Sequence, residues 1–238
     1  MQKIRHQTKI WIRSFLQNFN ASILFPGEKS PQYLREYVNE FYLRQCKGIL
    51  HIGANTGGEA NYYSSLGKRV VWIEGDPEVF NVLLKNIELH ENQEAICALL
   101  SDKQELTTFY IADNNGLSSS VHQILEVDNH WKIKMVSTKL LKTEIFDNLA
   151  ISEVSDLDFW IIDVQGHEYE VLVGASKRIM WARWILVEIS TKQFYEKQRV
   201  FKDVDSLLSN HGFMRLHEPM DEHCEVLYMR PYSTAIKH

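Results

Sequence analysis

A glycine-rich segment at residues 53–58 is the first place in the sequence where residue types and spacing indicate chemistry. It reads Gly-Ala-Asn-Thr-Gly-Gly and lies between the apolar run 48–52 and a stretch that we expect to be helical. Glycine permits a tight turn and lets a ligand approach the backbone closely. The segment lacks the G-x-G-x-x-G pattern of dinucleotide-binding loops. On its own it is as consistent with a structural turn as with a binding site.

An acidic residue stands at the distance from this loop that is typical of nucleoside sites. Glu74 ends the apolar run 69–74, and 74 − 53 = 21 residues separate it from Gly53. An acid at such a spacing, on the tip of the neighbouring strand, can accept hydrogen bonds from ribose hydroxyls. The alternative is an acid that merely ends a strand in solvent. The pair favours nucleoside binding, with contacts predicted at Gly53, Ala54, Asn55, Gly57 and Glu74.

Polar residues also follow two later apolar runs. Ser101 and Asp102 come after the run 94–100, and Asp102 is placed to accept a hydrogen bond from an adenine amino group, although a lone Asp is more often a turn residue. Asp163 lies near the end of the run 158–164, where a buried acid without a role would be costly. His167 follows in the expected first turn of a helix. Its imidazole can transfer protons near neutral pH, and a solvated helix-start residue is nearly as good an interpretation.

Strand and helix patterns alternate along the chain, which predicts an α/β fold with a mostly parallel sheet covered on both faces. The expected strands are 48–52, 69–74, 94–100, 106–112, 132–140, 158–164, 183–189, 212–217 and 225–230. The last two are joined by a short turn, which predicts one antiparallel strand. The expected helices are 31–45, 58–66, 77–89, 166–175 and 200–210, with a further amphipathic helix at 3–19.

Length and charge limit the classes of protein to which this chain can belong. A chain of 238 residues suits one α/β domain and is short for two, so we expect a helical extension at 1–47 and a single domain at 48–238. The net charge of −5 gives no drive toward nucleic acid. The sequence has no apolar run long enough to span a bilayer and no pattern of a secretory signal, which predicts a cytoplasmic protein.

The helix at 3–19 has two interpretations, and its apolar stripe favours the first. It packs on the domain or on a second subunit, which makes a homo-oligomer an open expectation. Alternatively, its lysines and arginines attach it to an anionic membrane surface.

Cysteine and histidine spacing does not indicate a metal site. Cys46, Cys97 and Cys224 lie far apart, with no C-x-x-C pair, so neither a zinc knuckle nor a redox dithiol is predicted. His122 and His130 flank a loop, but the acidic residues near them do not form a recognisable ligand pattern. We therefore expect no bound metal.

Several motifs together resemble the FkbM-type methyltransferases, which use S-adenosylmethionine. The resemblance extends over about 48–230, and its most specific blocks are I-D-V-Q-G-H-E at 162–168 and V-L-V-G-A at 171–175. The other blocks are I-G-A-N-T-G at 52–57, W-I-E-G-D-P at 72–77, L-S-D at 100–102 and N-N-G-L-S-S-S at 114–120. It implies a Rossmann-like class I methyltransferase fold with seven strands, one of them antiparallel.

The resemblance also implies a cofactor and a reaction. S-adenosylmethionine would contact 53–57 and Glu74, with its adenine near Asp102, and leave as S-adenosylhomocysteine. Family members often methylate hydroxyls on sugars of glycans or natural products, so the expected partner is a small-molecule or glycan acceptor. A base that removes the hydroxyl proton would help by roughly 10²–10⁴-fold. Our candidates are Asp163 first and His167 second, with Ser118, Ser119 and Gln165 expected on the acceptor side.

Two departures from the family pattern leave alternatives open. His51 and Gln165 stand where many members carry an Asp and a Glu. These changes would suit a subgroup with a different acceptor, or a degenerate member that acts as a binding subunit. A nicotinamide-dependent oxidoreductase is the third hypothesis, but it lacks its glycine fingerprint.

Overall fold

The computed structural model describes residues 31–114, 116–125, 133 and 135–231. The chain divides into two compact units, Met1–Phe41 and Tyr42–His238, and the first described helix, α2 (Pro31–Gln45), runs across the division. It matches the helix predicted at 31–45. The predicted helix at 3–19 lies outside the described residues, as do its subunit and membrane interpretations. The domain boundary expected after residue 47 stays a proposal.

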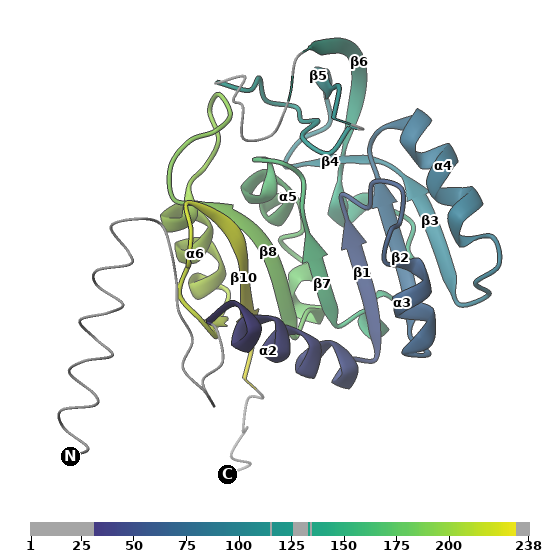
Figure 1. Cartoon of the computed structure of the whole chain (residues 1–238), viewed down its shortest axis with the longest axis vertical. Coiled ribbons are helices and arrows are strands. Elements are labelled where there is room, and N and C mark those ends of the chain that lie inside the picture. The colour runs from purple at the N-terminus through teal and green to yellow at the C-terminus, as the bar shows by residue number, and fades with distance from the viewer. Residues whose placement is uncertain (1–30, 115, 126–132, 134, 232–238) are drawn as a thin grey trace, which may run out of the picture. The chain divides into compact units, whose positions relative to one another are not determined.

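A seven-stranded sheet forms the centre of the second unit, and it confirms the predicted fold class (Figure 1). Its order is β3-β2-β1-β7-β8-β10-β9. Neighbours from β3 to β8 are parallel, and β10 is antiparallel to both β8 and β9. The strands are β1 (Gly48–Ile52), β2 (Arg69–Glu74), β3 (Gln93–Cys97), β7 (Phe159–Ile162), β8 (Trp184–Ser190), β9 (Met214–Arg215) and β10 (His223–Met229).

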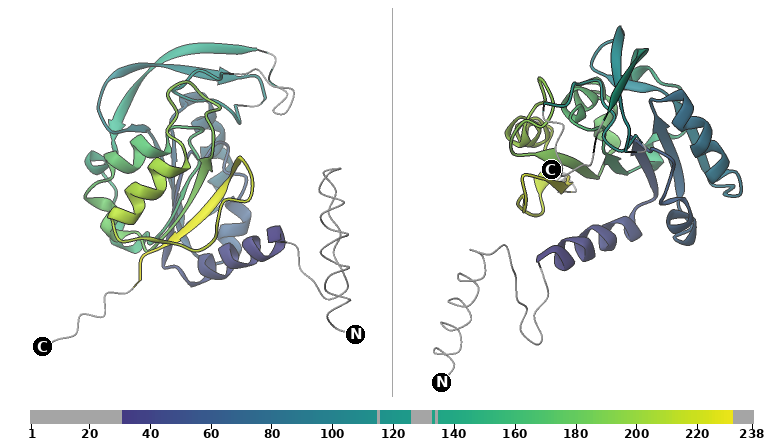
Figure 2. Two further views of the ribbon diagram at one scale, coloured as in Figure 1. Left: turned by 90° about the vertical axis from the view of Figure 1, so that its left-hand side faces the viewer. Right: turned by 45° about the horizontal axis from the view of Figure 1, so that its top comes forward.

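Helices cover both faces of this sheet because its central strands are apolar on both sides. Leu50 and Ile52 of β1 belong to the main core cluster, together with Val171 of α5 and Leu208 of α6. His51, which alternates with them, contacts α3 on the opposite face. Figure 2 shows α5 and α6 on the same side of the sheet. The helices are α3 (Ala60–Ser65), α4 (Pro77–Ile87), α5 (Glu168–Gly174) and α6 (Phe201–Asn210).

A second, three-stranded sheet has the order β4-β6-β5 and corrects two sequence predictions. The expected strand 94–100 is two strands, β3 in the main sheet and β4 (Leu99–Ser101) in the second. Ala98 marks the change, because its N–H bonds to Glu74 O beyond the last paired residue of β3. The strand predicted at 132–140 is β6 (Val136–Ile145), since antiparallel pairing with β5 (Leu106–Ala112) and then parallel pairing with β4 set its length.

The chain reverses its direction of travel across the main sheet at β1. From β1 it proceeds to β2 and β3 on one side, and later to β7 and β8 on the other. Ligands of open α/β sheets bind outside the carboxyl ends of the strands at such a switch point. The loops after β1 and β7 therefore lie where a ligand is expected. In Figure 1 the strands β5 and β6 lie above this edge of the sheet.

The helices within the described ranges include none with both the length and the apolar character that crossing a bilayer requires.

Candidate functional site

A cavity lies at the carboxyl ends of β1, β2 and β7, and we call it the first cavity. It encloses about 770 Å³ when the space open to solvent at its mouth is included. Its polar wall comes from the predicted loop and strand ends, at Gly53, Asn55, Glu74, Gly75, Asp76, Ser119, Asp163, Gln165 and His167. Its apolar wall includes Val79, Leu99, Phe109, Leu117 and Val121. This combination suits a flat ring joined to a polar chain.

Gly53 is required by the close approach of two strand ends. Its φ is +81°, and an added Cβ would lie 1.7 Å from the carbonyl oxygen of Asp163. The N–H of Asp163 donates to the carbonyl of Ile52 at 3.0 Å, and the N–H of Gly53 donates to the carbonyl of Ile73 at 2.9 Å. The turn is therefore held between β2 and β7, and no other residue type fits there.

Glu74 is buried and its carboxylate is fixed by backbone donors. The N–H of Asn55 donates to Oε2 at 2.8 Å, and the N–H of Asp76 donates to Oε1 at 2.7 Å. Burial raises the pKa of Glu74 to about 7, against these two hydrogen bonds, which lower it. A carboxylate has about four lone-pair positions, so it retains acceptor capacity for ligand hydroxyls.

A largely buried carboxyl pair, Asp163 and Glu188, lies near the ends of β7 and β8 and is bridged by Gln165. The side-chain amide of Gln165 donates to Asp163 Oδ1 and to Glu188 Oε2, each at 2.6 Å, and its carbonyl oxygen accepts from Tyr195 Oη at 2.7 Å. The other oxygen of Glu188 lies 2.9 Å from His223 Nε2. Gln165 adopts φ +53°, an uncommon backbone conformation that this network stabilises.

The pKa values of this pair are raised. Burial raises the pKa of Asp163 well above its ordinary value, and the neighbouring Glu188 adds to the effect. Burial, with Glu168 second, raises the pKa of Glu188 to about 8. Like charges this close cannot both ionise cheaply. The pair therefore retains a proton near neutral pH, and Gln165 contributes donors without adding a third charge.

A second, larger and more polar cavity adjoins the first, and we call it the second cavity. It encloses about 1610 Å³ including open space. Charged side chains of both signs line it, at Asp102, Lys103, Glu105, Glu170, Lys197, Arg199 and Asp203. Val121 and His167 line both cavities. These two residues mark the place where ligands in the two cavities would meet.

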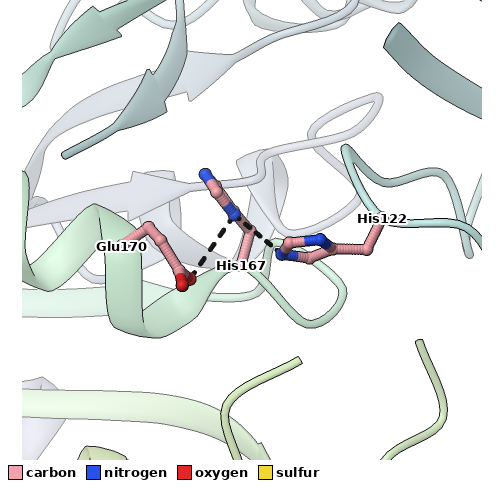
Figure 3. Close-up of side chains that lie close together, drawn as sticks. All are labelled: His122, His167 and Glu170. Carbon is pink, nitrogen blue, oxygen red and sulfur yellow. Dashed lines mark hydrogen bonds and ion pairs between the residues drawn. The ribbon is translucent and has the colours of Figure 1, made fainter. Parts of the chain in front are cut away.

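His167 joins three other polar side chains at this junction. Its Nε2 lies 3.0 Å from Ser101 Oγ, and its Nδ1 lies 3.0 Å from His122 Nε2 and 3.4 Å from Glu170 Oε2 (Figure 3). Burial lowers the pKa of His167 to about 3, with His122 and Lys103 as smaller causes. Burial also lowers the pKa of His122 and raises that of Glu170. Both imidazoles are therefore neutral at physiological pH.

The predicted cofactor residues divide between the two cavities. Gly53, Asn55, Glu74 and Asp163 line the first cavity, and the flanking Ala54 and Gly57 shape its loop. Ser101 and Asp102 line the second cavity instead. Asp102 accepts from Ser101 Oγ at 3.1 Å. The adenine contact expected at Asp102 stays a prediction, and the apolar wall around Leu99 and Phe109 is a further place for such a ring.

The residues predicted to contact the methyl acceptor are positioned mainly by hydrogen bonds within the protein. Ser119 lines the first cavity and its Oγ accepts from the N–H of Ala112 at 3.1 Å. Ser118 is buried, and its Oγ accepts from Asn114 Nδ2 at 2.9 Å. Gln165 lines the first cavity with its side-chain amide already engaged. Their contacts with an acceptor stay a prediction.

His51 does not line either cavity. It stacks on Trp72 with ring centroids 4.9 Å apart, and its Nδ1 lies 3.4 Å from Tyr63 Oη. Burial lowers its pKa to about 4, so it is neutral. The departure from the family at this position therefore changes an aromatic cluster on the α3 face, and not the wall of the first cavity.

Sequence reasoning missed Glu188, Tyr195 and Glu170 and dismissed His122. Glu188 lies near the end of the apolar strand β8, the same signal that singled out Asp163. Glu170 and His167 are three residues apart on one helix face, where i and i+3 side chains meet. Nothing local connects either residue to His122, because the contact spans 45 residues.

Comparison with known proteins adds a match over most of the described domain. The methyltransferase FkbM domain matches residues 51–214, more than half of the chain. The 2-O-methyltransferase NoeI of Sinorhizobium fredii (strain NBRC 101917 / NGR234) is 23% identical over 170 residues, which cover 67% of this chain and 70% of NoeI.

Solved structures show weaker likeness. Magnesium protoporphyrin IX methyltransferase (ChlM) from Synechocystis PCC 6803 is 11% identical, with 94% of this chain and 97% of that chain covered and a TM-score of 0.48. EvdMO1 is 15% identical with a TM-score of 0.45, and the match covers 92% of this chain but 46% of EvdMO1, about half its length. Both TM-scores are low, so the family assignment rests on the sequence match.

Proposed function

The chain belongs to the FkbM methyltransferase family, and from this membership and its two cavities we propose that it methylates a hydroxyl of a polyhydroxylated acceptor, such as a sugar or glycan. S-adenosylmethionine, the cofactor expected from the sequence, is the methyl donor of this family. The proposal assigns the donor to the first cavity and the acceptor to the second. The name of NoeI, a 2-O-methyltransferase, supports oxygen as the methylated atom.

One observation carries the proposal: the two cavities share His167 and Val121. Methyl transfer is an in-line displacement, so the acceptor oxygen must lie about 3 Å from the methyl carbon and opposite the sulfur. A junction between the first cavity and a polar cavity is consistent with that arrangement. Charged groups of both signs in the second cavity can bind many hydroxyls, whereas an apolar acceptor would remove water from them without offering hydrogen bonds in return.

The acceptor oxygen forms a bond to the methyl carbon while the carbon–sulfur bond breaks, and that electron pair neutralises the sulfonium. The acceptor hydroxyl would enter the first cavity past His167, and its proton passes to a base, for which we propose Asp163. This residue lines the first cavity, and its raised pKa makes its ionised form a stronger proton acceptor, with the proton of the pair held by Glu188. We propose that His167, the second candidate, contacts the acceptor, because it lines both cavities, while its lowered pKa makes it the weaker base.

Cofactor and acceptor are tested separately. Calorimetry should detect binding of S-adenosylhomocysteine and none of NAD; binding of NAD alone would support the oxidoreductase hypothesis and overturn the proposal. Incubation with S-adenosylmethionine and a panel of sugars and glycans should yield a product with one added methyl, located on oxygen by mass spectrometry. Methylation at nitrogen or carbon would overturn the acceptor assignment.

Asp163→Asn tests the proposed base. The variant should bind S-adenosylhomocysteine and lose about 10²–10⁴-fold in turnover, because the amide cannot take the proton. Normal turnover in this variant would remove Asp163 from the mechanism.

A further inference from the structure

The steps above use only His167 of a side-chain cluster at the junction of the cavities, which also contains His122 and Glu170. We propose that it binds a divalent first-row transition-metal cation through His122 Nε2, His167 Nδ1 and the Glu170 carboxylate. This site differs from the metal-free expectation drawn from the sequence. The ligand atoms all lie within 4.8 Å of one another, and Figure 3 shows the three side chains converging.

The spacing of the atoms fits a coordination sphere. With metal–ligand bonds of roughly 2.0–2.1 Å, neighbouring ligands lie about 3.3 Å apart in a tetrahedron and about 3.0 Å apart in an octahedron. Nδ1 of His167 lies 3.0 Å from His122 Nε2 and 3.4 Å from Glu170 Oε2. Two of the three distances between the ligand atoms are therefore already those found around a bound metal ion.

The hydrogen bonds around His167 leave Nδ1 with its lone pair. A hydroxyl has one proton, and Ser101 donates it to Asp102 Oδ1. The oxygen of Ser101 therefore accepts the Nε2–H of His167, at 3.0 Å. Metal-binding histidines commonly donate their second ring nitrogen in this way, which fixes the ring and its tautomer. Ser101 and Asp102 would thus support the ligand.

The Glu170 carboxylate is a second reason to expect a cation here. Its Oε2 is buried and, among the described residues, accepts no hydrogen bond. A buried carboxylate oxygen without a partner is costly. The nearest imidazole nitrogen, His167 Nδ1, carries no proton in the arrangement above, so it does not relieve that cost. A cation at the centre of the cluster would satisfy all three groups together.

The ligand set defines the class of cation. Two imidazoles and one carboxylate suit Zn²⁺, Fe²⁺, Co²⁺ or Ni²⁺, whereas Mg²⁺ and Ca²⁺ prefer oxygen ligands. Three protein ligands leave at least one coordination position open, as in catalytic sites. That position faces the second cavity, which all three residues line. On the proposed function, the cation would bind the acceptor hydroxyl there and lower its pKa.

Cation binding is measured on the full chain after treatment with a chelator. Titration with Co²⁺ is monitored by visible absorption, and titration with Zn²⁺ is monitored by calorimetry. We expect one equivalent to bind. His122→Ala and Glu170→Gln should each weaken Co²⁺ affinity at least about tenfold, a loss at the lower end of that seen on removing a supporting residue. His90→Ala, at a histidine outside the cluster, should bind Co²⁺ as the parent does.

Two outcomes would overturn the proposal: no stoichiometric Co²⁺ binding by the parent, or equal binding by the parent and both cluster variants. The first would make the cluster a hydrogen-bonded array only. Thermal unfolding of each variant, and calorimetry with S-adenosylhomocysteine, show whether its fold and first cavity are intact. Cation binding without any sugar methylation would support this site and count against the proposed acceptor, so the two proposals fail separately.

Discussion

At the carboxyl edge of the sheet, single residues matter in two ways: they let backbone segments come close together, and they hold protons between neighbouring carboxyl groups. Gly53 allows two strand ends to meet, and Glu74 holds the loop by accepting from Asn55 and Asp76. Asp163 and Glu188 share a bridge, Gln165, whose amide supplies donors to both carboxyls. The chemistry at this edge therefore depends on contacts between residues far apart in sequence.

Gly53→Ala should abolish binding of S-adenosylhomocysteine, because the new Cβ would lie 1.7 Å from the carbonyl oxygen of Asp163. Calorimetry measures the loss. Gly212→Ala is a matched control, since Gly212 has the same φ of +81° and an added Cβ there meets nothing within 4 Å. The control should lose only about 1–2 kcal/mol of stability from the left-handed backbone. Equal binding by both variants would contradict the close-approach argument.

Glu188 should make the protein less stable as pH rises. Its pKa is raised from 4.5 to about 8 in the folded state, so the folded state holds a proton that the unfolded state has released. The stabilisation is complete below pH 4.5 and is lost as pH rises through 8. Above about pH 7 the histidines whose pKa values are lowered are neutral in both the folded and the unfolded state, so they do not contribute to this change in stability.

Glu188→Gln should therefore flatten the fall in unfolding free energy between about pH 7 and 9, by at most about 1.4 kcal/mol per pH unit. Urea unfolding at several pH values measures the slope. Glu91→Gln, at an exposed acid, is the control and should keep the parent slope. A Glu188→Gln slope as steep as that of the parent would show that the proton resides elsewhere.

At the scale of elements, the second sheet closes the site over the edge of the first. Strand β4 follows β3 after only Ala98, and β5 contributes Phe109 to the apolar wall. Lys139 connects β6 to the start of α4: its Nζ lies 2.5 Å from Asp76 Oδ1 and 3.7 Å from Glu78 Oε1. Asp76 is buried and also caps α4 by accepting from the N–H of Glu78. This contact fixes the sheet against the first cavity.

Lys139→Ala should cost about 1–3 kcal/mol of stability and weaken S-adenosylhomocysteine binding, since a buried carboxylate in the cavity wall loses its charged partner. Lys142→Ala is the control on the same strand: its side chain is 61% exposed and lies 3.6 Å from Glu144. An exposed pair contributes little, so that change should stay within about 0.5 kcal/mol. Thermal unfolding and calorimetry compare the two, and similar losses would contradict the role of the Lys139 contact.

At the scale of the whole molecule, both cavities are built within the second unit. Their lining residues run from Ile52 to Asp203, inside the range 42–238. A chain that starts at Ser30 should therefore bind S-adenosylhomocysteine with unchanged affinity by calorimetry. Reduced liposome binding in that chain would support the membrane interpretation of residues 3–19, and a smaller assembly by light scattering would support the subunit interpretation. A loss of cofactor binding would show that the N-terminal segment completes the first cavity.

Local patterns in the sequence determined the order of strands and helices, the loop at 53–58 with Glu74, and the family. They succeed because turn geometry, helix capping and the alternation of apolar residues act over a few neighbouring positions. Such patterns do not reveal which strand changes sheets, so the split of 94–100 into β3 and β4 was missed. Only the tertiary structure decided that Glu188 meets Asp163, that His51 faces an aromatic cluster, and that His122 reaches His167 and Glu170. Each of these pairings depends on packing across the sheet between residues far apart in the chain, and burial in those places then sets their charge.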